Sequence, residues 1–413
     1  MKKIILLSLS VFALITFSST KKAQSTDYQY YWMKIAAKDK FQRSVIANTG
    51  AAIEIVKDDY VIAYGSDIEL QRIQKLGWLQ ASSNLAFEKK DFPTADSAYH
   101  NYARLVTDLN DLATKNADLV TLTSIAKTLE GHDIWALRIS GDQAHASERP
   151  AVIFLGGHHA REHLSVEMPL MLAQYLIAQY RGGNTRVINL VNSRDIHIIP
   201  TVNPDGMEYD INDGSYKMWR KNRARNADGT SGVDLNRNYG FQWGTGGSST
   251  DTNSEVYRGP KPFSEIESTA IKNYIESHGN ITELLSFHSY SKLILYPWGH
   301  KYDGIEVTND KLVHEKMAKT MAVWNDYTPQ QASELYIASG DTTDWAYGVH
   351  KIISFTFELD PASGGFGGGG FYPGADVIQP VFQKNIEPAL YMLEYADNPY
   401  RVLNVSTGPI FKP

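Results

Sequence analysis

The chain has 413 residues, of which 43% are hydrophobic and 21% charged, a composition typical of a globular protein large enough for more than one domain. Its formal net charge of −6 gives no reason to expect nucleic acid or an anionic membrane as a partner. Cysteine is absent, which excludes disulfides, thiolate metal ligands and a cysteine nucleophile, so any metal must be bound by His, Asp or Glu.

The N-terminus has the features of an export signal. Lys2 and Lys3 give it a positive start, and residues 4–17 are an apolar run broken only by Ser and Thr. This run is short for a membrane span and suits the core of a signal peptide. We predict a signal peptide over residues 1–23 and a secreted mature protein, extracellular or periplasmic, with no membrane partner after cleavage. An uncleaved N-terminal anchor is the alternative.

Residues 24–90 have the pattern of a small compact block. We expect strands at 30–35, 52–56, 60–64 and from 78 onward, and helices at 38–47 and 68–76. The order β-α-β-β-α-β is the split βαβ pattern of a small α+β fold. The block ends at the basic pair Lys89-Lys90, before Asp91-Phe92-Pro93, which is typical of a protease-sensitive linker. An ordinary N-terminal subdomain that stays attached is the alternative.

Beyond this linker, helices and strands alternate through residues 91–400, before a tail at 401–413. Strands are expected at 120–126, 133–139, 151–155, 194–201, 283–288, 293–296 and 352–358, with helices at 99–116, 164–180, 264–277, 311–324, 342–347 and 380–395. The polar but aromatic-rich stretch 203–262 is expected to be a long functional loop. The alternation predicts an α/β domain with a mixed, mostly parallel twisted sheet flanked by helices.

Three of the predicted strands end near residues that can bind a metal ion or move a proton. His159 follows the strand 151–155, His288 ends the next of the three, and Glu358 ends the last. Residues at the carboxyl ends of sheet strands can converge in one crevice. Glu162 lies three residues after His159, so both side chains can reach one ion from a first helical turn. A His/Glu/His set with one open position is the expected make-up of a catalytic zinc site in a chain without cysteine.

The same turn admits other interpretations. His159, Glu162 and His163 fit the inverted zincin motif, in which both histidines bind the metal and the glutamate is the base. That motif needs a helix spanning all three residues, whereas His159 here follows Gly-Gly at a strand end. A hydrogen-bonded polar turn without metal is the plainest alternative. His158 and His163 are expected to serve packing or hydrogen bonding.

Motifs far apart in the chain point to one family. In chain order they are His159-Ala-Arg-Glu162, Met218-Trp-Arg-Lys221, Asp234-Leu-Asn-Arg-Asn238, His288-Ser-Tyr290, Tyr336 and Phe355-Thr-Phe-Glu358. Residues 91–395 resemble the zinc carboxypeptidases of the carboxypeptidase A type, and most of all the bacterial carboxypeptidase T branch. The resemblance implies a zinc carboxypeptidase-like catalytic domain at 91–400, and an inhibitory propeptide of the split βαβ (ferredoxin-like) type at 24–90.

The resemblance also implies a role for individual residues around one Zn²⁺ ion. His159, Glu162 and His288 match the zinc ligands, and Asp234 matches the carboxylate that orients the first histidine. Glu358 matches the general base, which takes a proton from the attacking water. Considered alone, a glutamate at a strand end is as often structural.

Further matches concern the substrate. Arg220 corresponds to the arginine that polarises the scissile carbonyl, and Asn236 with Arg237 corresponds to the pair that holds the terminal carboxylate. Tyr336 resembles the mobile tyrosine that closes over the substrate, and Arg161 an outer-subsite arginine. Taken singly, the arginines would more often be solvated and the tyrosine a core residue.

Specificity is predicted to be mixed. Thr343 falls where the family places the residue at the base of the pocket for the departing side chain, and it is neither large and apolar nor acidic. Asp341 could add negative charge to the pocket, so apolar, aromatic and basic C-terminal residues are all expected. Position 217 is Lys where several relatives have arginine, which keeps the charge and loses the bidentate fork. The segment 141–148 is poor in acids, so calcium is not supported there.

Together these observations predict a secreted monomeric zinc carboxypeptidase made as a zymogen, which acts on peptide or protein C-termini and is inhibited by its own propeptide. Two alternatives stay open. One is a cell-wall peptide amidase on the same fold, and the other is a non-catalytic secreted peptide-binding protein. The pair Asn236 and Arg237, with Tyr336, favours ordinary peptide C-termini as substrate.

Overall fold

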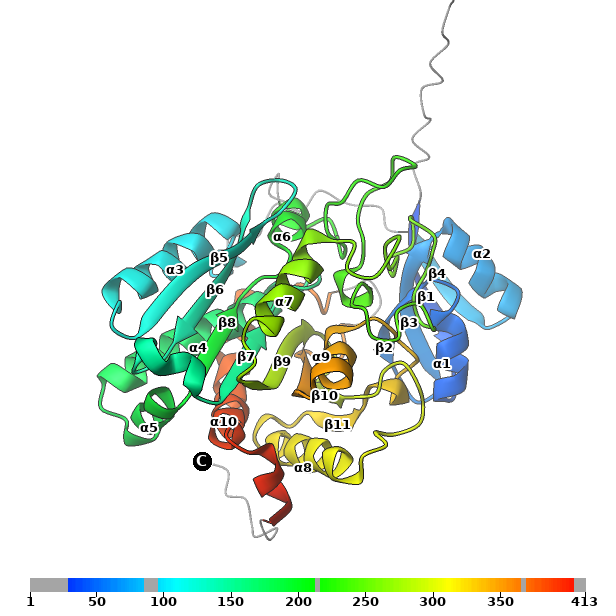
Figure 1. Ribbon diagram of the computed structural model, residues 1–413. Helices are drawn as coiled ribbons and strands as arrows, with labels where there is room; N and C mark the ends of the chain where they lie inside the picture. The colour runs from blue at the N-terminus through cyan, green and yellow to red at the C-terminus, as the bar shows by residue number, and fades with distance from the viewer. Residues whose placement is uncertain (1–28, 85–95, 212–215, 365–368, 405–413) are drawn as a thin grey trace, which may run out of the picture.

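The computed structural model describes residues 29–84, 96–211, 216–364 and 369–404. Within these ranges the chain builds two sheets, a small one near the N-terminus and a large one in the remainder (Figure 1). The predicted signal peptide, the pair Lys89-Lys90 and most of the C-terminal tail lie outside the described residues. Among the helices of the described ranges, none is long and apolar enough to cross a membrane.

The small sheet has four antiparallel strands in the order β2-β3-β1-β4. Its elements are β1 (Tyr30–Ala36), α1 (Lys40–Ala47), β2 (Ala52–Val56), β3 (Tyr60–Ser66), α2 (Asp67–Leu76) and β4 (Leu79–Asn84). Helix α1 begins where Asp39 accepts a hydrogen bond from the Gln42 amide, and α2 begins at a capping box of Ser66 and Glu69 and ends at the left-handed Gly77. The predicted β-α-β-β-α-β order is confirmed.

The large sheet has eight strands in the order β11-β10-β12-β9-β7-β8-β6-β5. Its strands are β5 (Val120–Lys127), β6 (Asp133–Ile139), β7 (Ala151–Leu155), β8 (Asp195–Ile199), β9 (Ile281–Ser289), β10 (Leu293–Tyr296), β11 (Thr328–Gln331) and β12 (Ile353–Leu359). The central strands β12, β9, β7 and β8 are parallel, and antiparallel pairs join β6 and β5 at one side and β10 at the other. The predicted mixed sheet is confirmed.

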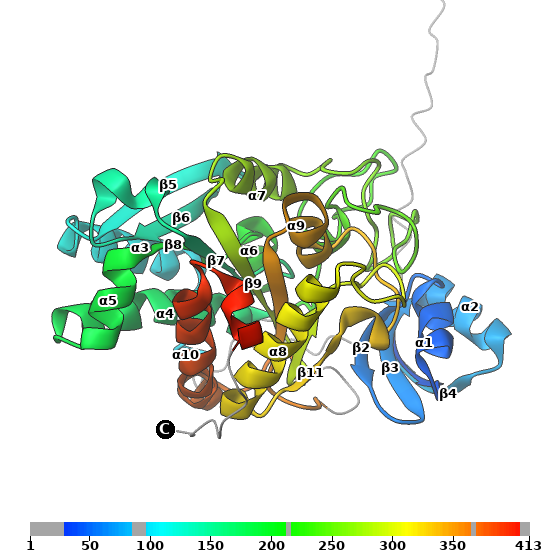
Figure 2. The same ribbon diagram turned by 60° about the horizontal axis from the view of Figure 1, so that its bottom comes forward.

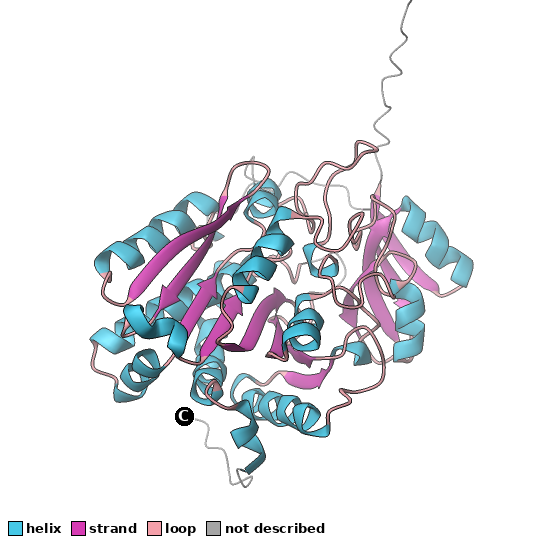
Figure 3. Ribbon diagram, viewed as in Figure 1, coloured by secondary structure: helices cyan, strands magenta, loops and turns pink. Residues whose placement is uncertain are grey.

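Helices cover both faces of this sheet, as the magenta strands between cyan helices show in Figure 3. They are α3 (Tyr102–Lys115), α4 (His163–Arg181), α5 (Thr185–Ser193), α6 (Pro204–Ile211), α7 (Ile266–Glu276), α8 (Thr308–Asn325), α9 (Thr342–His350) and α10 (Ile378–Tyr395). Along β7, Val152 and Phe154 face a core shared with α3, α4, α5, α8 and α10, while Ile153 and Leu155 face a core shared with α7 and α9. Figure 2 shows α8 and α10 together in front of the sheet. Burial on both faces explains the continuous apolar run of this strand.

The stretch 203–262 differs from the long loop predicted for it, because it contains the helix α6. Asn203 accepts a hydrogen bond from the Gly206 amide at 3.0 Å through its side-chain oxygen, and Pro204 is the first helical residue. A capping side chain followed by proline is a strong helix start, since proline already has a helical φ and lacks the amide that would need a partner. The mixed composition of the whole stretch hid this short signal.

Candidate active site

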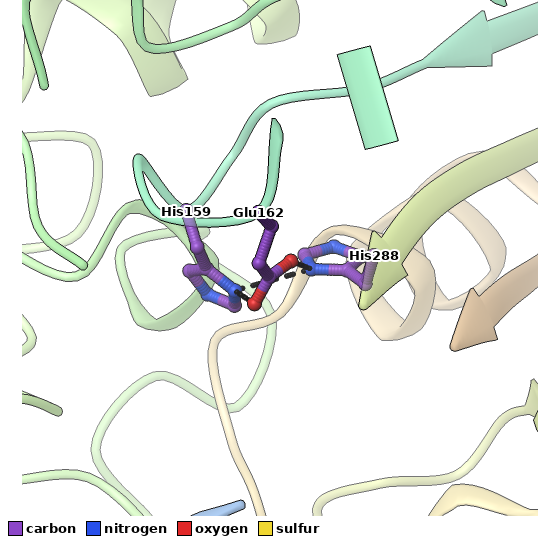
Figure 4. Close-up of side chains that lie close together, drawn as sticks. All are labelled: His159, Glu162 and His288. Atoms are coloured by element: carbon purple, nitrogen blue, oxygen red, sulfur yellow. Dashed lines mark hydrogen bonds and ion pairs between the residues drawn. The ribbon is translucent and has the colours of Figure 1, made fainter. Parts of the chain in front are cut away.

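His159 and Glu162 lie in the turn between β7 and α4. Gly157 in this turn has a φ of +61°, and a side chain there would come within 2.6 Å of the Thr201 hydroxyl oxygen, so glycine is required. The turn brings the His159 ring back toward Glu162, which directly precedes α4. His288 joins them from the end of β9 (Figure 4).

These three side chains fit one metal ion. The His159 Nδ1 atom lies 2.6 Å from Glu162 Oε1, His288 Nδ1 lies 3.0 Å from Glu162 Oε2, and the two Nδ1 atoms are 3.2 Å apart. Ligand atoms around a tetrahedral Zn²⁺ at about 2.0–2.1 Å would be about 3.3 Å apart. Two imidazole nitrogens that face each other so closely next to a carboxylate are the donor set of a cation site. The group can hold one metal ion, and its donor set fits the single Zn²⁺ that was predicted.

The electrostatics of Glu162 agree with that donor set. Burial acts to raise the pKa of Glu162, but His159 and then His288 outweigh it and hold the pKa below its ordinary value. A carboxyl group that stays ionised in a buried place suits a metal ligand. The neighbouring His163 instead lies with its Nε2 atom 2.9 Å from Asp210 Oδ2 and is not part of the metal-binding group, so the inverted motif is not formed.

A second group of acids and histidine within the described residues is explained by protein contacts. It consists of Glu130, His132 and Asp205, near the turn between β5 and β6. Asp205 accepts hydrogen bonds from the Thr128 hydroxyl and from the Glu130 amide, and it lies 2.7 Å from the His132 ring. The buried carboxylate therefore has its partners without a metal ion.

Asp234 links three parts of the site from a fully buried position. Its Oδ1 atom lies 3.2 Å from His159 Nε2 and accepts a hydrogen bond from the Asn236 amide at 3.0 Å. Its Oδ2 atom accepts a hydrogen bond from Arg220 Nε at 3.1 Å and lies 3.1 Å from Arg220 Nη2 in the same ion pair. Although burial acts to raise the pKa of Asp234, Arg220 and His159 hold it well below its ordinary value. A permanently charged carboxylate behind a ligating histidine orients that ring.

Arg220 and Glu358 face the metal group from two sides. Arg220 lies with its Nη1 atom 4.0 Å from Glu162 Oε1 and remains charged. Glu358, on β12, is the register partner of His288 on β9. Burial raises the pKa of Glu358 and the charge of Glu162 raises it further, while Arg220 opposes the rise. A zinc ion at the three ligands would oppose it too, because positive charge favours the carboxylate.

Asn236 and Arg237 lie in a short 3-10 turn after Asp234. The Asn236 side-chain oxygen accepts from both the amide and the hydroxyl of Thr342, each at 3.0 Å. Arg237 donates to the Gly247 carbonyl at 3.0 Å and to the Asn236 carbonyl at 2.7 Å. Both side chains line one cavity together with Tyr336, so a cation and an amide face it side by side.

The pocket predicted for the departing side chain is part of the same cavity. The Thr343 hydroxyl bonds that of Thr356 at 2.7 Å, which leaves the pocket base weakly polar. Asp341 caps α9 through Oδ1, which accepts from the Asp344 amide, whereas its buried Oδ2 atom has no hydrogen-bond partner among the described residues. Burial, and next the charge of Asp344, raise the pKa of Asp341 to about 8.

Arg161 points out of the metal turn toward the N-terminal sheet. It is fully buried between the rings of Tyr64 and Phe371, at 5.1 and 4.5 Å from their centroids. Its guanidinium lies 2.6 Å from Glu54 on β2 and 3.0 Å from Glu255. The two glutamates were not predicted, although an acid in the middle of the apolar run Ala-Ile-Glu-Ile-Val of β2 was a usable signal.

Nine of the twelve predicted site residues line one cavity. Of the other three, His288 and Asp234 contact the lining residues Glu162 and His159, and Arg161 precedes Glu162 in the chain. The lining residues are His159, Glu162, Arg220, Asn236, Arg237, Tyr336, Asp341, Thr343 and Glu358. Ile53, Glu54 and Val56 of β2 line the same cavity. The structure thus brings together residues that the sequence separates by up to 305 positions, from Ile53 to Glu358.

Comparison with known proteins agrees with this arrangement. A family model described as zinc carboxypeptidase matches residues 105–388. The chain is 37% identical over 374 residues to a zinc carboxypeptidase of Saccharothrix mutabilis subsp. capreolus, covering 88% of this chain and 82% of that protein. It is 32% identical to bovine carboxypeptidase B, covering 72% of this chain and 70% of that one.

Solved structures give the same answer for the fold. A carboxypeptidase A from Helicoverpa armigera superposes with a TM-score of 0.75 at 24% identity, covering 92% of this chain and 98% of that one. Bovine thrombin-activatable fibrinolysis inhibitor, in complex with a tick carboxypeptidase inhibitor, superposes with a TM-score of 0.65 at 27% identity, covering 76% of this chain and 100% of that one. With the family model matching most of the chain and the His-Glu-His group in place, the chain belongs to the zinc carboxypeptidase family.

Proposed function

We propose that the protein removes single residues from the C-termini of peptides and proteins with mixed specificity, and that it is exported as an inactive zymogen. The observation that carries the proposal is the convergence of the His-Glu-His group, Arg220, Glu358 and the Asn236–Arg237 pair on one cavity. Metal ligands, a base, a fixed positive charge and a carboxylate clamp are the parts that terminal peptide hydrolysis needs.

The reaction divides among these residues. Zinc held by His159, Glu162 and His288 would lower the pKa of water to about 7 and polarise a carbonyl. Glu358 takes the proton of the attacking water and passes it to the leaving amine. Arg220, held in place by Asp234, stabilises the negative charge that develops on the scissile carbonyl oxygen.

The clamp makes the proposed enzyme act at chain ends. Arg237 offers a guanidinium and Asn236 an amide to a carboxylate in the cavity, which Tyr336 also lines. An internal peptide bond has no carboxylate to place there. Thr343 forms a weakly polar bottom of the pocket, which suits apolar and aromatic terminal side chains. The carboxyl group of Asp341 supports acceptance of basic ones.

The N-terminal sheet is proposed to inhibit the enzyme until it is cleaved off. Two elements of this N-terminal block contact the catalytic part of the chain. On β2, Glu54 pairs with Arg161. On α1, Ser44 accepts from the Ile337 amide at 2.8 Å and Arg43 donates to the carbonyls of Glu334 and Leu335, so this helix holds the segment that carries Tyr336. The Tyr336 hydroxyl lies 3.5 Å from the Ile53 carbonyl. These contacts block the outer side of the cavity and restrain the tyrosine. Cleavage near Lys89-Lys90 would release the block.

The proposal is tested with a panel of N-blocked dipeptides that end in Phe, Leu, Lys or Glu. The full chain is assayed before and after limited treatment with trypsin, with and without a zinc chelator. We expect chelator-sensitive release of Phe, Leu and Lys only after trypsin treatment. Release that withstands the chelator, or cleavage of dipeptides whose C-terminus is amidated as fast as free ones, would contradict it. Export is tested by N-terminal sequencing of the protein recovered outside the cytoplasm.

A further inference from the structure

A buried hydrogen-bond chain runs behind the metal group to the carboxylate clamp. It begins at His158, which is the residue before the metal-binding His159 and is fully buried. His158 Nε2 lies 3.0 Å from the Thr342 hydroxyl and 3.0 Å from the Tyr239 hydroxyl. Thr342, also fully buried, then reaches Asn236. None of these contacts belongs to the metal ligands or to the base.

The direction of each hydrogen bond in the chain follows from Asn236, where the chain ends. Asn236 Oδ1 can only accept, so both the amide and the hydroxyl of Thr342 donate to it. The Thr342 hydroxyl proton is taken up by the bond to Asn236, so the Thr342 oxygen can only accept from His158. His158 is therefore protonated at Nε2. The other ring nitrogen, Nδ1, then accepts from the Ser286 hydroxyl at 3.3 Å. These contacts need a proton on Nε2 and a free electron pair on Nδ1, which is one tautomer of the neutral imidazole.

This chain fixes which end of the Asn236 amide faces the cavity. With Oδ1 held by two donors, Nδ2 is turned toward the cavity that Asn236 lines. The reversed amide would set its NH₂ group against the Thr342 amide, two donors facing each other in a buried place, and would turn an oxygen toward the incoming carboxylate. The donor–donor contact and the repulsion between that oxygen and the carboxylate both disfavour the reversed amide.

We propose that Thr342 and His158 are positioning residues for recognition of the substrate's terminal carboxylate, acting through Asn236. The inference rests on the proposed function, in which Asn236 is half of the clamp. Since Thr342 touches neither the metal group nor the scissile bond, its loss should weaken binding of the carboxylate while leaving the chemical step almost unchanged. A hydrogen bond to a charged group accounts for about a tenfold or greater effect on binding.

The test uses Thr342→Val, which removes the hydroxyl and keeps the volume, with Thr342→Ser as the rescuing variant. For trypsin-treated full chain and an N-blocked dipeptide ending in Phe, we expect Thr342→Val to raise KM about tenfold and to change kcat less than about threefold. Competitive inhibition by L-phenylalanine should weaken by the same factor, and inhibition by L-phenylalaninamide, which has no carboxylate, should not change. Thr342→Ser should restore KM. Bound zinc, measured by atomic absorption, should stay at one ion per chain.

His158→Phe keeps a ring beside His288 and removes the donor. If both residues act through one chain, the double variant His158→Phe/Thr342→Val should bind L-phenylalanine no more weakly than Thr342→Val alone. An unchanged KM in Thr342→Val, a loss confined to kcat, or fully additive effects would overturn the inference. Failure of the proposed function looks different, because the unchanged chain would then release no terminal residue in a chelator-sensitive way.

Discussion

The carboxylate of Glu54 on β2 lies 2.6 Å from the guanidinium of Arg161, the residue just before the metal-binding Glu162. Both side chains are almost fully buried, so the small sheet and the catalytic part of the chain share an ion pair next to the metal group. Glu255 pairs with the same arginine at 3.0 Å from the catalytic side. If the small sheet is removed, as proposed, Arg161 would therefore keep a partner, whereas Glu54 would not.

We predict that Glu54→Gln weakens the hold of the N-terminal sheet. Loss of a buried charged hydrogen bond costs about 1.5–3 kcal/mol, or about a tenfold or larger change in an equilibrium. The uncleaved chain should accordingly gain about tenfold in activity on an N-blocked dipeptide, with no change after trypsin treatment. Asp58→Asn, an equivalent change in the exposed turn after β2, is the control and should have no effect. An uncleaved Glu54→Gln protein as inactive as the unchanged one would contradict the proposed inhibitory contact.

Removal of the metal should abolish activity and lower thermal stability. The His159, Glu162 and His288 side chains sit 2.6–3.2 Å from one another and lose their common partner. A ligand that binds only the folded state stabilises it by mass action, so the midpoint of thermal unfolding should fall on chelation and recover with added Zn²⁺. Differential scanning fluorimetry and dipeptide assays measure the two effects. Recovery with Mg²⁺ at equal concentration would argue against a site of two histidines and one carboxylate.

Glu358→Gln should remove the proposed base without removing the metal. General-base catalysis contributes about 10²–10⁴ in rate, so kcat should fall by that factor while KM changes little. Zinc content, measured on the same sample, should stay at one ion per chain, which separates loss of chemistry from loss of the ion. The exposed Glu148→Gln is the matched control. A kcat within tenfold of the unchanged enzyme would show that another group takes the proton.

Asp341 should make the preference for basic residues depend on pH. Its pKa is raised to about 8, so the carboxyl is neutral below that pH and negative above it. The terminal Lys side chain stays positive throughout, since its pKa is about 10.4. The ratio of kcat/KM for Lys over Phe should therefore rise several-fold between pH 6.5 and pH 9. In Asp341→Asn, which can still cap α9, the ratio should stay flat across this range. A ratio that rises equally in both proteins would assign the effect elsewhere.

Much of this site was predictable because strand ends carry its chemistry. His159, His288 and Glu358 follow or end short apolar runs typical of buried strands, and parallel strands bring their carboxyl ends together. The order of helices and strands in the N-terminal block also followed from local signals, such as the Ser66 helix cap and the turn at Asp58. Here local preference and final fold agree.

What could not be predicted depends on tertiary pairing. Glu54 and Arg161 are far apart in the chain, and although an acid within the apolar run of β2 hints at a buried partner, nothing local identifies Arg161 as that partner. The edge strand β11 begins with a short polar run that includes Pro329 and becomes a strand only because β10 offers it a parallel partner. The orientation of the Asn236 amide likewise depends on Thr342, more than a hundred residues later.

The buried carboxylate of Asp234 sets the size of the fragment that the proposed enzyme releases. One oxygen holds the His159 ring and the Asn236 backbone, and the other holds Arg220. The point of cleavage and the anchor for the chain end are thus tied to the same group, and the interval between them is constant. For the proposed carboxypeptidase this interval corresponds to one residue, so the expected products are free amino acids released one at a time from a peptide that shortens stepwise.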